Sequence, residues 1–266
     1  MLGLGLSAVS STTGSAAVER GAAFSNTKSL SFDGTNDVAR WASNATIPGL
    51  IGAGDFSISW WVKKANFFPA SSGTEPFFIS SIFFAGGLQS LYFSANGDSN
   101  SSPGRLQVLF GNTGSTFYVS ISTSDDLRSS VADNVWHHFV LTSDAGASSR
   151  TNKLYVNGSE LSYTSNTSNG VDFSGVDLGD LALGSSTFNL GSDTFHQVEY
   201  DEISMYTSVL SSSDVSAIYN SRVPADESSR SGLVGYWRLE DNGDDSSSNS
   251  NNLTVTGATF TTDVPS

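Results

Sequence analysis

Cysteine is absent from this chain of 266 residues, which excludes disulfide bonds, thiol catalysis and cysteine-ligated zinc sites. Charged residues are also scarce, at 14% of the sequence, so serine, threonine, asparagine and the 26 glycines must supply much of the polar surface. These residue types favour strands, turns and loops over helices. The composition therefore indicates an all-β protein.

Basic residues are few as well, and the 12 lysines and arginines form no basic run in a chain of net charge -14. This charge balance argues against binding to nucleic acid or to an anionic membrane. No stretch approaches the ~20 apolar residues that a membrane-spanning helix needs. The start of the chain lacks the basic segment and apolar core of a secretory signal. We therefore interpret residues 1–26, which are rich in small residues, as a flexible N-terminal arm.

Aromatic residues, by contrast, are plentiful at 11%, and with 38% hydrophobic residues they can fill a sizeable core. From Ser29 onward, short apolar or alternating runs recur between clusters of Gly, Asn, Asp and Ser, which is typical of a sandwich or barrel. Asn157-Gly158 predicts a tight hairpin turn. Ser211–Arg222 is the exception, because Val215 and Ile218 have helical spacing behind capping residues.

Four segments in this order carry a family resemblance: Ser29–Asp37, Phe56–Lys63, Val135–Thr142 with Lys153–Gly158, and Tyr200–Tyr206 followed by the helix. Together they resemble laminin G-like domains of the concanavalin A-like lectin and glucanase superfamily. The resemblance implies a jelly roll, a β-sandwich of two antiparallel sheets with one short surface helix. We expect this sandwich to occupy residues 27–266 as one domain.

The segment Gly232–Phe260 looks like the opening strands of such a domain, although it lies near the end of the chain. A circularly permuted single domain would explain it, and so would the stump of a second repeat. A stump would leave Tyr236 and Trp237 with nothing to pack against, so permutation is favoured. We therefore expect residues 232–260 to supply strands that close the sheet.

Enzymes of the superfamily must also be considered. Retaining glucanases of this fold resemble one another in a Glu-x-Asp-x-(x)-Glu motif on one strand, where two carboxylates flank the sugar bond. Glu199 and Asp201 begin this pattern, but Ile203 and Ser204 occupy the positions of the last glutamate. Adjacent residues of a strand point to opposite faces, so His137 and His138 cannot chelate one metal ion together. The third histidine, His196, is isolated in sequence. We predict no enzyme activity.

Two kinds of binding site remain as expectations. Members of the superfamily often hold a structural Ca²⁺ through hard oxygen ligands, and this resemblance points to Asp33 and Asp201, with hydrogen-bonded turn carboxylates as the alternative. Sugars stack on aromatic rings beside polar loops. Trp41, Tyr92 and Tyr118 lie near such loops and are the candidates for glycan binding.

The Gly, Leu and Ser-rich start, without signal peptide or cysteine, is similar to laminin G-like structural proteins of tailed, particularly marine, bacteriophages. This resemblance implies a non-enzymatic virion protein, namely a decoration, fibre or adhesin subunit. Its partners would be other virion proteins, copies of itself and a host-surface glycan. The alternative is a secreted, extracellular microbial carbohydrate-binding module. A glucanase is the third and least favoured hypothesis.

Overall fold

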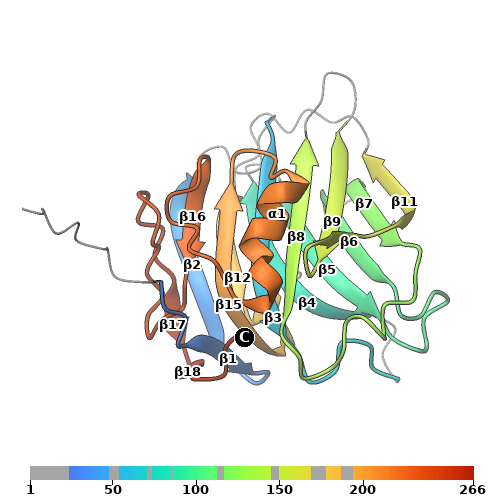
Figure 1. Cartoon of the computed structure of the whole chain (residues 1–266), viewed down its shortest axis with the longest axis horizontal. Helices are drawn as coiled ribbons and strands as arrows, with labels where there is room; N and C mark the ends of the chain where they lie inside the picture. The colour runs from blue at the N-terminus through green and yellow to red at the C-terminus, as the bar shows by residue number, and fades with distance from the viewer. Residues whose placement is uncertain are drawn as a thin grey trace, which may run out of the picture.

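The computed structural model describes residues 24–47, 54–70, 74–84, 87–112, 117–144, 150–168, 178–186 and 194–266. These residues form antiparallel sheets and one short α-helix (Figure 1), which confirms the predicted all-β sandwich. The first sheet contains, in spatial order, β10 (Ser159–Glu160), β9 (Thr151–Val156), β8 (His137–Asp144), β3 (Phe56–Lys63), β15 (Gln197–Tyr206), β1 (Ser29–Asp33) and β18 (Thr259–Thr261). A further strand, β16 (Leu233–Trp237), also pairs with β15.

The second layer consists of two sheets that lie side by side. The larger contains β11 (Tyr163–Ser168), β7 (Phe117–Thr123), β6 (Leu106–Asn112), β5 (Gly87–Asn96) and β4 (Thr74–Phe84). The smaller contains β12 (Leu178–Leu183), β2 (Val38–Ile47) and β17 (Thr254–Thr256), and β12 runs beside β4. A short pair, β13 (Ser185–Ser186) and β14 (Thr194–Phe195), completes the strands of the described residues.

Alternation along β3 assigns its side chains to two faces, as the period of two residues predicts. Trp60 lies in the core between the layers, where its ring is 4.6 Å from that of Phe93 and 5.6 Å from that of Phe139. Trp61 lies on the outer face of the first sheet and stacks on Tyr219. Both indoles are almost completely buried, so the first sheet is covered on both faces.

The outer cover is the predicted helix, which the structure divides into α1 (Ser212–Tyr219) and a 3₁₀ turn, η1 (Asn220–Arg222). Ser211 caps α1 in a capping box with Asp214, which satisfies backbone donors at the first turn. Val215 and Ile218 are buried against Tyr206 and its neighbours on the outer face of the first sheet. The expected amphipathic face is confirmed.

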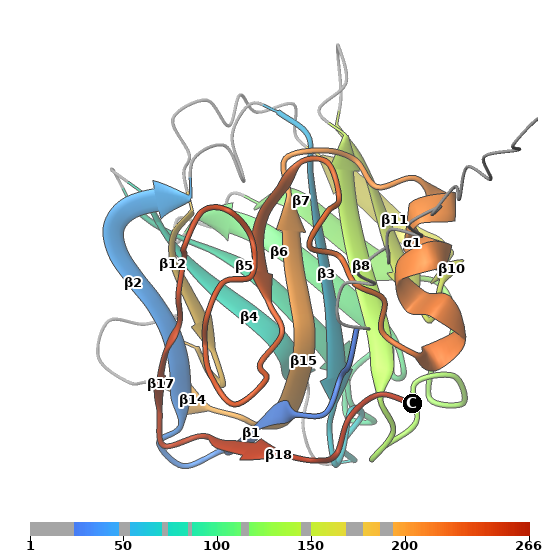
Figure 2. The ribbon, with the colours of Figure 1, turned by 60° about the vertical axis from the view of Figure 1, so that its left-hand side comes forward.

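The first described strand, β1, and the late strand β16 meet on one edge of β15. Residues 30–33 of β1 pair with residues 197–200 of β15, and β16 pairs with residues 203–206 of the same strand. β17 pairs with β2 and β18 with β1, so the last described segment adds strands to both layers (Figure 2). Trp237 is fully buried in the core. An origin by circular permutation stays a prediction.

One carboxylate organises the Asp, Ser and Asn-rich turn between β16 and β17. The two oxygens of Asp245 accept hydrogen bonds from the backbone N–H groups of Tyr236, Ser247 and Asn251 at 2.8–2.9 Å, and from the Ser247 hydroxyl at 2.8 Å. The Trp237 indole N–H in turn donates to the Asn251 carbonyl oxygen at 2.8 Å. Asp245 thus supports the position of the core residue Trp237.

We predict that Asp245→Ala lowers the free energy of unfolding by about 2 kcal/mol or more, because several backbone donors lose a charged acceptor. The midpoint of thermal unfolding, measured by circular dichroism, should fall by about 5 °C. Asp244→Ala is the matched control, since Asp244 is exposed in the same turn. Equal midpoints for the two variants would contradict this role of Asp245.

Candidate functional site

A β-bulge in β15 lies at the junction between β1 and β16. Asp201 pairs with Trp61 and Ser204 with Ser59, so Glu202 and Ile203 together oppose the single residue Trp60. The extra residue places the side chains of Asp201 and Glu202 on the outer face, while Ile203 remains in the core. Both carboxylates are 0% exposed, and Glu202 has a positive φ of 45°. Such backbone strain marks a position that its surroundings hold in place.

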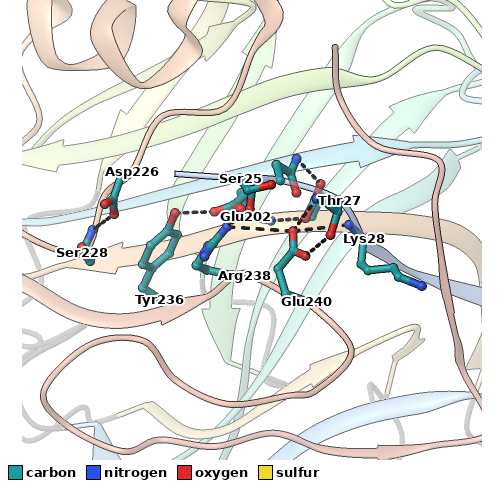
Figure 3. A network of polar contacts seen from close by, with 11 residues as sticks. Ser25, Thr27, Lys28, Glu202, Asp226, Ser228, Tyr236, Arg238 and Glu240 are labelled. Atoms are coloured by element: carbon teal, nitrogen blue, oxygen red, sulfur yellow. Dashed lines mark hydrogen bonds and ion pairs between the residues drawn. The ribbon is translucent and has the colours of Figure 1, made fainter. Parts of the chain in front are cut away.

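The two buried carboxylates have different partners. Asn26 donates its amide N–H to Asp201 Oδ2 at 2.8 Å, and the Glu202 backbone N–H donates to Asp201 Oδ1 at 3.0 Å. Glu202 accepts the hydroxyl of Tyr236 and lies 3.4 Å from Arg238 Nε (Figure 3). Arg238 is thus the cation that compensates Glu202.

Burial dominates the acidity of the pair. It raises the pKa of Glu202 to about 8, although the Tyr236 hydrogen bond and Arg238 act in the opposite direction. Burial also raises the pKa of Asp201 well above its ordinary value, and repulsion from Glu202 adds to this effect. The pair therefore retains a proton at neutral pH.

The same junction binds residues 24–28, the N-terminal segment. Glu240 accepts the Thr27 backbone N–H and the Thr27 hydroxyl, both at 2.6 Å, and the Lys28 backbone N–H at 3.3 Å. Arg238 donates to the Ser25 carbonyl oxygen (Figure 3). It also lies over the Phe24 ring at 4.5 Å. Residues 24–26 of the expected arm thus contact the sandwich, and residues 1–23 lie outside the described part of the chain.

A third buried carboxylate, Glu227, approaches β15 from the loop before β16. It accepts hydrogen bonds from the Ser204 hydroxyl, at 2.8 Å, and from the Tyr206 hydroxyl. Glu227 is only 1% exposed. Burial raises the pKa of Glu227 to about 7. Sequence reasoning missed Glu227 and Glu240, because neither lies in a motif and their partners are distant in sequence.

Comparison with family models matches residues 32–216 to the family described as the concanavalin A-like lectin/glucanases superfamily. The chain belongs to this superfamily. Comparison with curated proteins finds no match. The superfamily resemblance expected from the four sequence segments is therefore confirmed.

Solved structures similar to this chain have low sequence identity to it. A candidate carbohydrate binding protein from Bacteroides ovatus is 19% identical, with a TM-score of 0.58 over 91% of this chain and 62% of that protein. A SAP-like pentraxin from Limulus polyphemus is 17% identical, with a TM-score of 0.48 over 73% of this chain and 82% of that protein. The binding domain of botulinum neurotoxin serotype D is 18% identical, with a TM-score of 0.49 over 73% of this chain and 42% of that domain.

The positions of β15 that correspond to the glucanase motif make structural contacts in this chain. Glu199 pairs with Lys63 at 2.9 Å, and Asp201 is fully buried. Ile203 lies in the core, and Ser204 donates to Glu227. A sugar cannot reach Asp201 in this arrangement, because the N-terminal segment contacts it.

The predicted calcium pair, Asp33 and Asp201, is not brought together. Asp33 pairs with Gln197, four residues before Asp201 on β15, so the two aspartates are about 13 Å apart along the sheet. Asp33 accepts the Thr35 backbone N–H at 2.7 Å, and Asp37 accepts the Asp33 N–H at 2.8 Å. These are turn carboxylates, so Asp33 and Asp201 do not share one ion.

The histidines on β8 lie in separate environments. His137 is 3.0 Å from the Ala132 carbonyl oxygen, whereas His138 Nε2 lies 2.8 Å from the Ser59 hydroxyl. Burial lowers the pKa of His138 to about 3, so this imidazole is neutral at physiological pH.

Within the ranges given above, no group of three or more His, Cys, Asp or Glu residues is arranged to hold a metal ion. No helix there is long and apolar enough to cross a membrane.

The glycan candidates have different outcomes. Trp41 is 7% exposed and packs in the core, so its prediction as a sugar platform is wrong. Its position on β2, between β12 and β17, explains the burial. Tyr92 and Tyr118 belong to β5 and β7, but their side chains lie outside the described part of the chain.

The pKa of Glu202 predicts how stability changes with pH. The unfolded carboxyl loses its proton near pH 4.5, whereas the folded one keeps it to about pH 8. Stability should therefore fall as the pH rises across this window. Between pH 6.5 and 8, Glu202→Gln should flatten the fall measured by urea unfolding relative to the wild type, because buried His138 contributes equally in both proteins. Exposed Glu160→Gln is the control, and an unchanged slope in Glu202→Gln would contradict the assignment.

Glu240 should control the N-terminal segment. In Glu240→Ala, the amides of Thr27 and Lys28 lose their acceptor, and we expect their hydrogen exchange to accelerate at least tenfold. Asp241→Ala removes only the exposed ion pair with Lys28 at 3.4 Å and should change exchange little. Similar protection in both variants would show that Glu240 does not hold this segment.

Proposed function

We propose that this chain is a non-enzymatic, carbohydrate-binding β-sandwich that serves as a subunit of a phage virion, as a decoration, fibre or adhesin protein. The main support for a non-enzymatic role is that Asp201, Glu202 and Glu227 are all at most 1% exposed and take part in internal hydrogen bonds. Catalytic carboxylates of a glycosidase must instead face the sugar bond.

Carbohydrate binding is supported by the shared fold of the Bacteroides ovatus protein, which is described as a candidate carbohydrate binding protein. Tyr92 and Tyr118 remain the proposed stacking residues. They lie on central strands of the sheet formed by β11, β7, β6, β5 and β4. The N-terminal segment belongs to the other layer, beside β1 and β16.

This separation suits a virion subunit. β1, β16 and β18 lie at the opposite end of the sandwich from β7 and β11 (Figure 1). The end that contains the N-terminal segment would contact other virion proteins or further copies of the chain. The sheet that contains Tyr92 and Tyr118 would remain free for a host-surface glycan. A secreted carbohydrate-binding module is the alternative, and it needs only the second of these surfaces.

A glycan array on the purified, folded chain tests the binding proposal, and arrays with and without Ca²⁺ test the calcium expectation. We expect a glycan signal that Tyr92→Ala or Tyr118→Ala reduces at least tenfold. Val223→Ala is the control, because Val223 is an apolar residue 51% exposed in the segment after η1. A silent array for the folded wild type would contradict glycan binding.

Antibodies against the chain distinguish the two biological settings. Labelling of phage particles is expected for a virion subunit, whereas labelling confined to the culture medium would favour the secreted module.

Incubation with β-glucan should release no reducing ends, and release that depends on Asp201 would overturn the non-enzymatic proposal.

A further inference from the structure

Residues 223–232, the strap, connect η1 to β16 on the outer side of the first sheet. Most of its residues are partly or fully exposed, and only Pro224 and Glu227 are buried. A buried glutamate in an otherwise exposed segment is unusual, because burial of a charge is costly unless the charge is paired. The side chain of Glu227 therefore anchors the strap by a contact that depends on its protonation.

The anchor contains hydroxyl donors and no direct cation. Glu227 Oε2 accepts the Ser204 hydroxyl at 2.8 Å and the Tyr206 hydroxyl, both from β15. No lysine, arginine or histidine of the described chain forms an ion pair with Glu227; the nearest cation on the strap, Arg230, pairs with Asp214 of α1 at 3.3 Å. Both hydroxyls would also donate to an ionised Glu227, which lowers its pKa, but without a paired cation they do not offset the cost of burying the charge.

The surrounding charges are mostly acidic. The titratable and charged groups that face Glu227 are Glu202 and Tyr206 from β15, Tyr236 from β16, and Asp226 and Arg230 from the strap itself, with Asp214 of α1 behind Arg230. Glu202 and Asp226 both oppose a second negative charge. Burial raises the pKa of Glu227 to about 7, so its proton is lost near neutral pH.

Besides its side chain, Glu227 contributes its backbone N–H, which donates to the Tyr236 hydroxyl oxygen of β16, and the remaining strap contacts lie toward its end. The Thr207 backbone N–H donates to the Gly232 carbonyl oxygen at 2.8 Å, and the Arg230–Asp214 ion pair is partly exposed. Exposed ion pairs contribute little to stability. Residues 223–229 thus depend mainly on Pro224 and Glu227 for their hold on the sheet.

We propose that the strap is a proton-controlled cover, which stays closed over Ser204 and Tyr206 while Glu227 is protonated and opens when Glu227 ionises. Opening exposes the outer face of β15 beside its pairing with β16. The proposal concerns a different face from the glycan surface and does not depend on the proposed function.

Hydrogen exchange of the full chain, followed by mass spectrometry at pH 6 and pH 8.5 and corrected for intrinsic rates, tests the cover. In the wild type, we expect protection of residues 223–229 to fall at least tenfold at the higher pH, while β3 and β8 stay protected. Glu227→Gln should retain protection at both pH values. Glu160→Gln, which neutralises an exposed acid outside the strap, should behave like the wild type. Equal strap protection at both pH values in the wild type would overturn the proposal.

A second measurement needs no variant. The ¹³C carboxyl shift of Glu227 in the wild type should titrate with the same midpoint as strap opening. Opening with a midpoint more than one pH unit from this titration would show that another group controls the strap.

Discussion

The pairing of β15 with both β1 and β16 is the constraint on which the rest of this structure depends. β1 takes the first half of one edge of β15, and β16 takes the second half. The bulge at Asp201 and Glu202, which shifts the pairing of β15 with β3, lies at this junction, and its two outward side chains bind Asn26 before β1 and Tyr236 of β16.

The outer face of the first sheet therefore includes a buried polar cluster around the bulge, beside the apolar cluster under α1. Asp201, Glu202 and Glu227 lie there with hydroxyl and amide partners under the N-terminal segment, the strap and α1. Buried acids are costly, and a chain with an excess of acidic residues has few cations to compensate them. The structure uses Arg238 for Glu202 and leaves Glu227 to hydroxyl groups, so protonation stabilises this polar cluster.

These contacts distinguish β15 of this chain from the catalytic strand of a glucanase. A glucanase needs exposed carboxylates on such a strand, at a separation suited to a sugar bond. Here the bulge turns Asp201 and Glu202 toward the N-terminal segment and β16, and Ser204 receives a carboxylate from outside the strand. These acidic residues therefore hold segments of the sandwich together, as expected for a protein that binds or assembles.

Much of the fold could be predicted from the sequence, because its signals are local. Alternation separated Trp60 from Trp61, capping chemistry located the helix at Ser211, and the ordered segments indicated the superfamily. The candidate site could not be predicted to the same extent. Glu240 binds Thr27 across 213 residues of sequence and Glu227 reaches Ser204 across 23, while Trp41 is buried by strands from elsewhere in the chain. The sequence by itself determined the strands, the turns and the missing glutamate at Ile203 and Ser204. Only the tertiary structure decided which carboxylates are buried and what they bind, because burial depends on segments that are brought together only when the chain folds.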